Sequence, residues 1–160
     1  MKIGVISDTH LEEPTPLLED TVRRYFQDVD MIIHAGDLVT LHILDAFKDK
    51  KVVAVTGNND GPEVKRILPA KQIIKAGDFR IGVIHGWGWP MGMGRKVSRE
   101  LEGVDCIVYG HSHWPASYHR DGILYFNPGA FSSGLPLPGR RTIGILTIDR
   151  QIHGRIIRVR

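Results

Sequence analysis

Two short segments place pairs of side chains that could bind a metal ion at one-residue spacing. Gly110-His111-Ser112-His113 follows a short apolar segment, and Asp8-Thr9-His10 follows another near the start of the chain. Side chains two positions apart at the end of a strand point to the same side, so each segment could offer two ligands together. An isolated His-x-His segment is more often a coincidence than a metal site. The polar residues between the two segments favour a metal site here.

Seven side chains form the candidate ligand set: Asp8, His10, Asp37, Asn58, His85, His111 and His113. Carboxylate, imidazole and amide groups without a thiolate suit manganese, iron or zinc better than calcium or magnesium. Seven ligands divide into two sets of four if one carboxylate is shared, as in sites whose two ions lie ~3.5–4 Å apart. Asp37 is the expected bridge, because it lies between the two sets in the sequence.

This donor set predicts a reaction as well as a site. Two such ions would neutralise the oxygens of a phosphate group and lower the pKa of a shared water toward ~7. The resulting hydroxide could attack the phosphorus atom in line with the leaving group. We therefore expect the hydrolysis of a phosphate ester.

The order of the predicted elements explains how distant ligands could meet. Three apolar segments are typical of buried strands: residues 2–7, 30–35 and 51–55. Two segments between them have helical spacing: residues 14–26 and 41–47. This alternation is typical of parallel βαβ units, whose binding sites lie beyond the carboxyl ends of the strands. The residues expected to converge there are Asp8, His10, Asp37 and Asn58.

After about residue 70 the pattern changes to short strands joined by turns. The predicted strands are residues 72–75, 79–84, 105–109, 116–119, 123–126, 142–148 and 154–159. The turns Gly77-Asp78 and Asp121-Gly122 predict two hairpins. A short helix is expected at residues 94–101, and a stiff loop at residues 134–139.

The loop at residues 86–94 contains four glycines, two tryptophans and two methionines, so we expect it to be mobile or to contact a ligand. Its large apolar side chains have three possible roles. They could form a wall for the substrate, a contact in a homo-oligomer or a cover over the core. The residues concerned are Trp87, Trp89, Met91 and Met93.

The polar segments, taken in order, resemble the five sequence blocks of the calcineurin-like metallophosphoesterases. The blocks are Asp8-Thr9-His10, Gly36-Asp37, Gly57-Asn58-Asn59-Asp60, His85-Gly86 and Gly110-His111-Ser112-His113. Their spacing most resembles the small single-domain prokaryotic phosphodiesterase branch, and the resemblance extends to about residue 135. It implies an α/β fold, a four-layer α/β/β/α sandwich of two mixed β-sheets flanked by helices.

Carried over residue by residue, the resemblance implies one ion on Asp8, His10 and His113, a second ion on Asn58, His85 and His111, and Asp37 as the bridge. Manganese is the first expectation for both ions, with nickel, iron or zinc as alternatives. Asp37, Asn58 and Asp60 are the expected catalytic residues, with Asp60 orienting a ligand imidazole or else acting as a turn or capping residue. Residue type alone also allows Asp8 as a helix cap, His10 at the surface and Asn58 in a turn.

Asn59 departs from the common family pattern. In many members the residue after the liganding asparagine is a histidine thought to protonate the leaving group. An amide has no proton that titrates near neutral pH. We therefore expect a phosphodiesterase that hydrolyses activated phosphodiesters better than alkyl phosphomonoesters.

Other functions remain open at this point. The retromer scaffold subunit of eukaryotes belongs to the same fold group, so the alternative is a catalytically weak protein-binding scaffold. Nucleases of this family usually carry further domains, and the net charge of +3 is too small to indicate nucleic acid. A small phosphoester is the expected partner.

Composition and length set the remaining expectations. The chain has 160 residues, 42% of them hydrophobic, which suits a single metallophosphoesterase domain over residues 1–160. It begins with a strand-like segment instead of a signal peptide and lacks an apolar run of ~18 residues. We therefore expect a cytoplasmic protein without membrane contact. Cys106 is the one cysteine and is expected to be a buried thiol.

Overall fold

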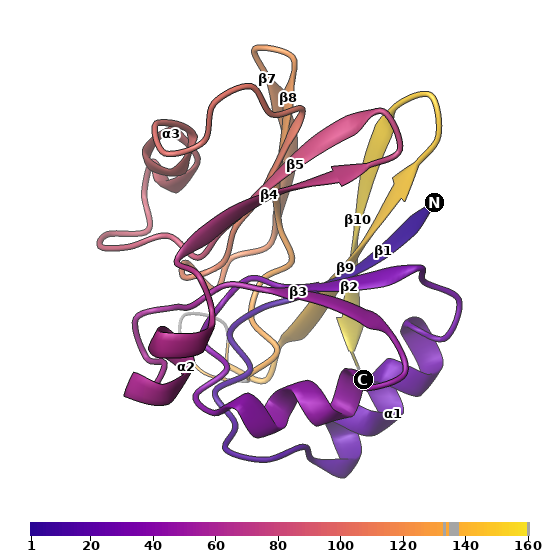
Figure 1. Ribbon diagram of the computed structural model, residues 1–160, viewed down its shortest axis with the longest axis vertical. Coiled ribbons are helices and arrows are strands. Elements are labelled where there is room, and N and C mark those ends of the chain that lie inside the picture. Colours follow the sequence, from indigo (N-terminus) through magenta and orange to yellow (C-terminus); the bar gives the residue numbers. More distant parts are fainter. Residues whose placement is uncertain (133, 135–137, 160) are drawn as a thin grey trace.

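Two five-stranded β-sheets face each other in the computed structural model, which describes residues 1–132, 134 and 138–159 (Figure 1). The first sheet has the order β10-β9-β1-β2-β3. Its strands are β1 (Lys2–Ile6), β2 (Met31–His34), β3 (Lys51–Ala54), β9 (Arg141–Ile148) and β10 (Ile152–Val159). β1, β2 and β3 are parallel, as the βαβ pattern predicted, whereas β9 and β10 are antiparallel to their neighbours.

The second sheet has the order β4-β5-β6-β8-β7. Its strands are β4 (Lys71–Ala76), β5 (Phe79–Ile84), β6 (Cys106–Val108), β7 (Ala116–Arg120) and β8 (Ile123–Asn127). The two predicted hairpins are present, β4 with β5 and β7 with β8, and the central pairs β5–β6 and β6–β8 are parallel. Both sheets are therefore mixed.

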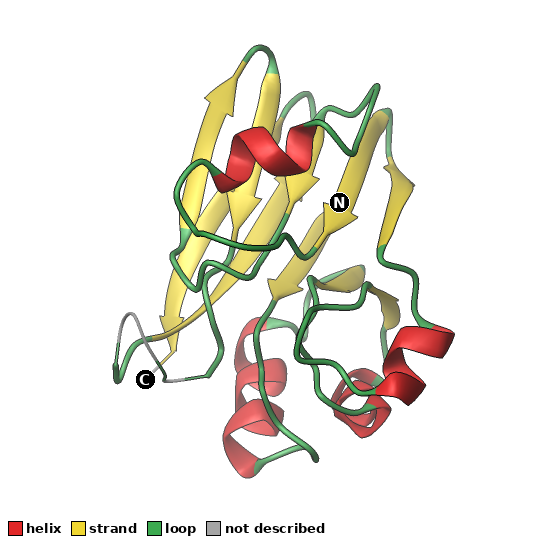
Figure 2. Cartoon of the chain, turned by 90° about the vertical axis from the view of Figure 1, so that its left-hand side faces the viewer, coloured by secondary structure: helices red, strands yellow, loops and turns green. Residues whose placement is uncertain are grey.

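Helices cover the outer face of each sheet (Figure 2). The first sheet packs against α1 (Pro16–Tyr25), the 3₁₀ helix η1 (Leu41–Phe47) and α2 (Pro62–Ile67). The second sheet packs against α3 (Met93–Ser98). The four-layer α/β/β/α sandwich is confirmed.

The helices differ from expectation in three respects. Residues 41–47 form a 3₁₀ helix, and α3 ends at Ser98 instead of residue 101. The helix α2 was not predicted, because its six residues are too few to show a helical period. Residues 135–137 of the loop expected at residues 134–139 lie outside the described residues. None of the described helices is long and apolar enough to cross a membrane.

The main core lies between the two sheets. Side chains such as Val5, Ile33, Val83 and Phe126 are almost completely buried there, and Cys106 is buried among them. Strands that bury side chains on both faces hold their ends in a fixed position. Backbone hydrogen bonds tie these ends together, from Asp8 N to Gly36 O at 3.0 Å and from Gly110 N to His85 O at 3.0 Å. Loops from both sheets thus meet at one edge.

Candidate metal centre

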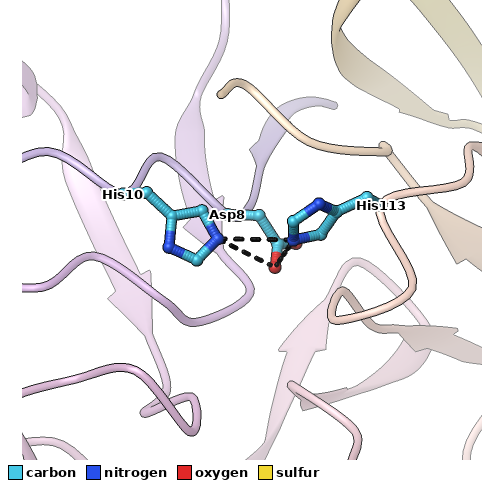
Figure 3. A group of neighbouring side chains, drawn as sticks. All are labelled: Asp8, His10 and His113. Carbon is cyan, nitrogen blue, oxygen red and sulfur yellow. Dashed lines mark hydrogen bonds and ion pairs between the residues drawn. The ribbon is translucent and has the colours of Figure 1, made fainter. Parts of the chain in front are cut away.

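Five candidate ligands cluster where strands of both sheets end. Asp8 and His10 follow β1, Asp37 follows β2, His85 follows β5, and His113 follows β6. The Nε2 atom of His113 lies 3.2 Å from Oδ1 of Asp8, and Nε2 of His10 lies 3.9 Å from the same oxygen (Figure 3). The Nε2 atom of His85 lies 3.3 Å from Oδ2 of Asp37 and 3.8 Å from Oδ1 of Asp8. Two carboxylates and three imidazoles therefore face one another.

His111 and Asn58 form a second pair beside this cluster. His111 Nδ1 lies 2.8 Å from Asn58 Oδ1, and His111 Nε2 lies 2.8 Å from the carbonyl oxygen of Gly88. The ring of His111 is 5.3 Å from the ring of His85, measured between centroids. A neutral imidazole has one N–H, yet both neighbours are oxygen acceptors, so one of the two contacts lacks a proton. An imidazole nitrogen and an amide oxygen side by side could bind a metal ion together.

The backbone at the ligands adopts an uncommon conformation. Five of the seven non-glycine residues with positive φ in the described chain are candidate ligands: Asp8, His10, Asp37, His111 and His113. Left-handed backbone costs of order 1–3 kcal/mol for a non-glycine residue and persists where the surrounding structure imposes it. The concentration of strain at the candidate ligands indicates a functional site.

Two buried polar atoms at the centre of the cluster lack hydrogen bonds in the described part of the chain, Oδ1 of Asp8 and Nε2 of His85. The Nδ1–H of His85 donates to the carbonyl of Ala35 at 2.7 Å, which orients Nε2 toward the carboxylates. Unpaired buried polar atoms cost free energy unless something binds them. These residues therefore fit a divalent cation.

Ligand atoms lie within 4.8 Å of one another in two groups. The first group is Asp8, His10 and His113, and the second is Asp8, Asp37 and His85. Asp8 belongs to both groups, whereas Asp37 belongs to the second alone, and His111 belongs to neither. The bridging role of Asp37 stays a prediction.

Asp37 and His85 change each other's protonation. Burial alone would raise the pKa of Asp37, but contact with His85 and hydrogen bonds from Asn59 hold it well below its ordinary value. Burial alone would lower the pKa of His85, but the charges of Asp37 and Asp8 raise it above its ordinary value. The buried carboxylates therefore hold a proton on His85, which a metal ion would displace.

Asn59 donates two hydrogen bonds to Asp37, the proposed bridging residue. Its backbone N–H donates to Oδ1 of Asp37 at 2.8 Å, and its side-chain amide donates to Oδ2 at 2.7 Å. The amide thereby fixes the Asp37 carboxylate. An amide in this position cannot serve as a general acid.

Asp60 is a backbone anchor in the structure. Its carboxylate accepts hydrogen bonds from Val39 N and Gly57 N, each at 2.7 Å, and from Asp37 N at 3.2 Å. The contact with Gly57 N, three residues earlier, matches the turn alternative for Asp60, and none of the three contacts is a hydrogen bond to a ligand imidazole. Asp60 thus joins the loops that carry Asp37 and Asn58. A direct catalytic role stays a prediction.

Asn127 anchors the histidine pair, a role that the sequence did not suggest. Its side-chain amide donates to Gly110 O at 2.9 Å and to Ser112 Oγ at 3.0 Å, and its Oδ1 accepts from Gly129 N at 2.8 Å. In sequence, Asn127-Pro128-Gly129 has only the composition of a turn. The partner residue lies 15 positions away, where no local pattern reveals it.

His34 lies behind the cluster and is completely buried. Its Nε2 atom lies 3.2 Å from Thr9 Oγ1, and burial lowers the pKa of the imidazole to about 3. His34 is thus a neutral core residue.

In the loop at residues 86–94 Met93 is buried, whereas the exposed fractions of Trp87, Trp89 and Met91 are 45%, 73% and 70%.

Comparisons with known proteins agree with this geometry. Residues 1–151 match the model of the calcineurin-like phosphoesterase superfamily domain. The sequence is 40% identical over 162 residues to probable metallophosphoesterase MJ0623 of Methanocaldococcus jannaschii, covering 98% of this chain and 81% of that protein. The solved structure of an archaeal phosphodiesterase superposes with a TM-score of 0.78 and 26% identity, covering 99% of each chain.

The fold is also similar to that of Vps29 from Entamoeba histolytica, solved in complex with Zn²⁺. The TM-score is 0.75 and the identity 22%, over 100% of both chains. At this identity the likeness shows a common fold and does not extend to activity.

Proposed function

Because this chain belongs to the calcineurin-like phosphoesterase superfamily, we propose that it is a phosphodiesterase that depends on two divalent metal ions. The observation that carries the proposal is the buried cluster of Asp8, Asp37 and His85, in which Oδ1 of Asp8 and Nε2 of His85 have no hydrogen bond among the described residues. Buried carboxylates beside an imidazole nitrogen suit a divalent cation, which would displace the proton of the imidazole.

The seven candidate ligands supply two ion sites in this proposal. Asp8, His10 and His113 would hold one ion, Asn58, His85 and His111 the other, and Asp37 would be shared. Bound ions of this kind neutralise phosphate oxygens and acidify water toward ~7. Manganese is the first candidate in this proposal, with nickel, iron or zinc as alternatives that suit imidazole ligands.

The exposed side of the cluster sets the direction from which substrate approaches. The side chains of His10 and His113 are 25% and 22% exposed, whereas those of Asp8 and Asp37 are buried. The phosphate therefore reaches the site over the histidines. The carboxylates stay beneath it, away from direct contact with a like-charged group.

The expected preference for activated diesters over alkyl monoesters rests on Asn59. This residue holds Asp37 through two hydrogen bonds and carries no titrating proton. Departure of the leaving group then depends on its own acidity. Activated diesters meet this requirement, and alkyl monoesters do not.

A protein-binding scaffold with weak activity is the second candidate function. The observation in its favour is the exposure of Trp87, Trp89 and Met91 on one loop, since neighbouring exposed apolar side chains are typical of interaction surfaces. A scaffold of this kind would bind a protein whether or not metal is present.

One experiment separates the two functions. Protein stripped with a chelator is reloaded with manganese, nickel, zinc, iron or magnesium and assayed with bis-(para-nitrophenyl) phosphate and para-nitrophenyl phosphate. The proposal predicts diester hydrolysis that appears with a transition metal and is lost in Asp37→Ala, while the exposed control His153→Ala retains it. Equal activity in Asp37→Ala and the unmodified protein would contradict a metallophosphodiesterase.

A further inference from the structure

A cavity of about 490 Å³ lies beside the histidine pair, between the start of α3 and strand β7. Its volume is in the range typical of small-molecule binding sites. Ser112 and Trp114 line it and flank His113 in the chain, whereas His111 and His113 themselves lie outside its lining. A molecule with its phosphate over the histidines could therefore extend into this cavity.

Two aromatic side chains form part of the cavity wall. Trp114 and Tyr118 line the cavity, with exposed fractions of 49% and 41%. The ring of Tyr118 stacks on Tyr125, with 5.2 Å between centroids and an interplanar angle of 5°. The backbone N–H of Trp114 donates to Ser112 Oγ at 3.3 Å, which ties the backbone of this residue to the turn of the proposed ligands. Exposed aromatic rings of this kind bind planar groups by stacking.

The same cavity is positively charged. Arg95 and Arg120 line it, and its described lining includes no aspartate or glutamate. Arg120 lies 3.3 Å from Asp121, while Arg95 forms no ion pair among the described residues. A guanidinium group recognises phosphate through paired hydrogen bonds. The cavity thus combines surfaces for a planar ring and for an anion.

We propose that this cavity binds the nucleoside part of a nucleotide diester, with the base against Trp114 and Tyr118 and a second phosphate against Arg95 and Arg120. The inference rests on the proposed phosphodiesterase function, because it names the substrate class of the same site. It places the reacting phosphate over the histidines and the second phosphate at the far side of the nucleoside.

Three chromogenic diesters with one common leaving group test this assignment on the metal-loaded protein. They are bis-(para-nitrophenyl) phosphate, thymidine 5′-(para-nitrophenyl phosphate) and the same nucleotide carrying a 3′-phosphate. We expect kcat/KM to be about tenfold higher with the 3′-phosphate than without it. Arg95→Gln combined with Arg120→Gln removes this preference. The control Arg99→Gln, an exposed arginine at the end of α3 outside the cavity, keeps it.

Trp114→Leu tests the stacking surface separately. It should raise KM for both nucleotides about tenfold relative to bis-(para-nitrophenyl) phosphate. Equal kcat/KM for all three diesters, or a 3′-phosphate preference that survives loss of both arginines, would overturn the proposal.

A binding measurement distinguishes failure of this inference from failure of the proposed function. If no diester is hydrolysed with any metal, the phosphodiesterase function fails, and calorimetric titration with thymidine 3′,5′-bisphosphate still tests the cavity. We expect the Kd to rise about tenfold in the double arginine variant and to stay constant in Arg99→Gln. An unchanged Kd in the double variant would refute the cavity assignment by itself.

Discussion

The Nε2 atom of His85 lies 3.3 Å from Oδ2 of Asp37, although the side chains are only 3% and 1% exposed. Charged groups are rarely buried without compensation. Here the compensation is mutual, since the pKa of Asp37 is held low and that of His85 is raised. His85 thus carries a proton in the metal-free protein, at the place where the proposed metal ions would provide the positive charge.

Metal binding should therefore release protons. The raised pKa of His85 means that its imidazole is protonated in the metal-free protein at pH values where an ordinary histidine is neutral. Calorimetric titration of the stripped protein with Mn²⁺, in buffers of different ionisation enthalpy, should show net release of protons near pH 7. The affinity should rise with pH through the raised pKa. Proton release of zero would contradict the protonated pair.

The same linkage gives a stability prediction for the metal-free protein. A raised histidine pKa contributes stability that is complete below the unfolded value of about 6.5 and is lost as the pH rises through the folded pKa. Denaturation of stripped protein should show a free energy of unfolding that declines above about pH 6.5, and His85→Gln should remove this decline. An identical pH profile in His85→Gln would show that other groups cause the decline.

His34 should have the opposite effect at lower pH. Its pKa falls from 6.5 to about 3 because of burial, so the unfolded state binds the proton more readily between these values. The stability contribution of the neutral imidazole is complete above pH 6.5 and is lost progressively as the pH falls to 3, by up to roughly 5 kcal/mol. Urea denaturation should show a shallower pH slope in His34→Leu and an unchanged slope in the exposed control His153→Gln. Equal slopes in all three proteins would count against a buried neutral His34.

Asn59 should make the rate depend steeply on the leaving group. Without a general acid, kcat is expected to fall strongly from aryl to alkyl phosphodiesters. Asn59→His should raise the rate with alkyl esters by about 10²-fold or more and change the aryl rate much less, because a poor leaving group benefits most from protonation. A flat dependence on leaving-group pKa in the unmodified protein would contradict this account.

Asn127 should hold the histidine pair in position for the metal. Asn127→Ala removes two hydrogen bonds to Gly110 and Ser112 within a buried environment. We expect a loss of about 1–3 kcal/mol in stability and a 10–100-fold weaker metal affinity. Isothermal titration with Mn²⁺ measures the affinity, and Ser117→Ala is the matched control, since this hydroxyl contacts Gly154 O away from the site. Unaltered affinity in Asn127→Ala would limit its role to folding.

Sequence patterns predicted most of the fold because they depend on local periodicity. The three parallel strands of the first sheet and both hairpins followed from apolar runs and turn residues. The helix α2 was not predicted from the sequence, because only Gly61 and Pro62 mark its start. The 3₁₀ geometry of residues 41–47 was likewise hidden, since helical spacing does not distinguish it from an α-helix over seven residues.

The sequence predicted that the candidate ligands lie close together, but not their individual contacts. One-residue spacing identified the ligand pairs Asp8/His10 and His111/His113, and the order of the strands placed both pairs at one edge of the sheets. Contacts between loops far apart in the sequence gave no local signal. The hydrogen bonds of Asn59 to Asp37, of His111 to Gly88, and the position of Asp8 in both ligand groups belong to this class.

The number of metal ions per chain tests the central claim most directly. Elemental analysis of protein loaded with Mn²⁺ and freed of excess should give two ions per chain, as expected for a two-metal site. His113→Ala and His111→Ala should each retain one ion, because the two histidines lie beside different ligands, Asp8 and Asn58. One ion in the unmodified protein, or two ions in either variant, would contradict a dinuclear centre held by this histidine pair.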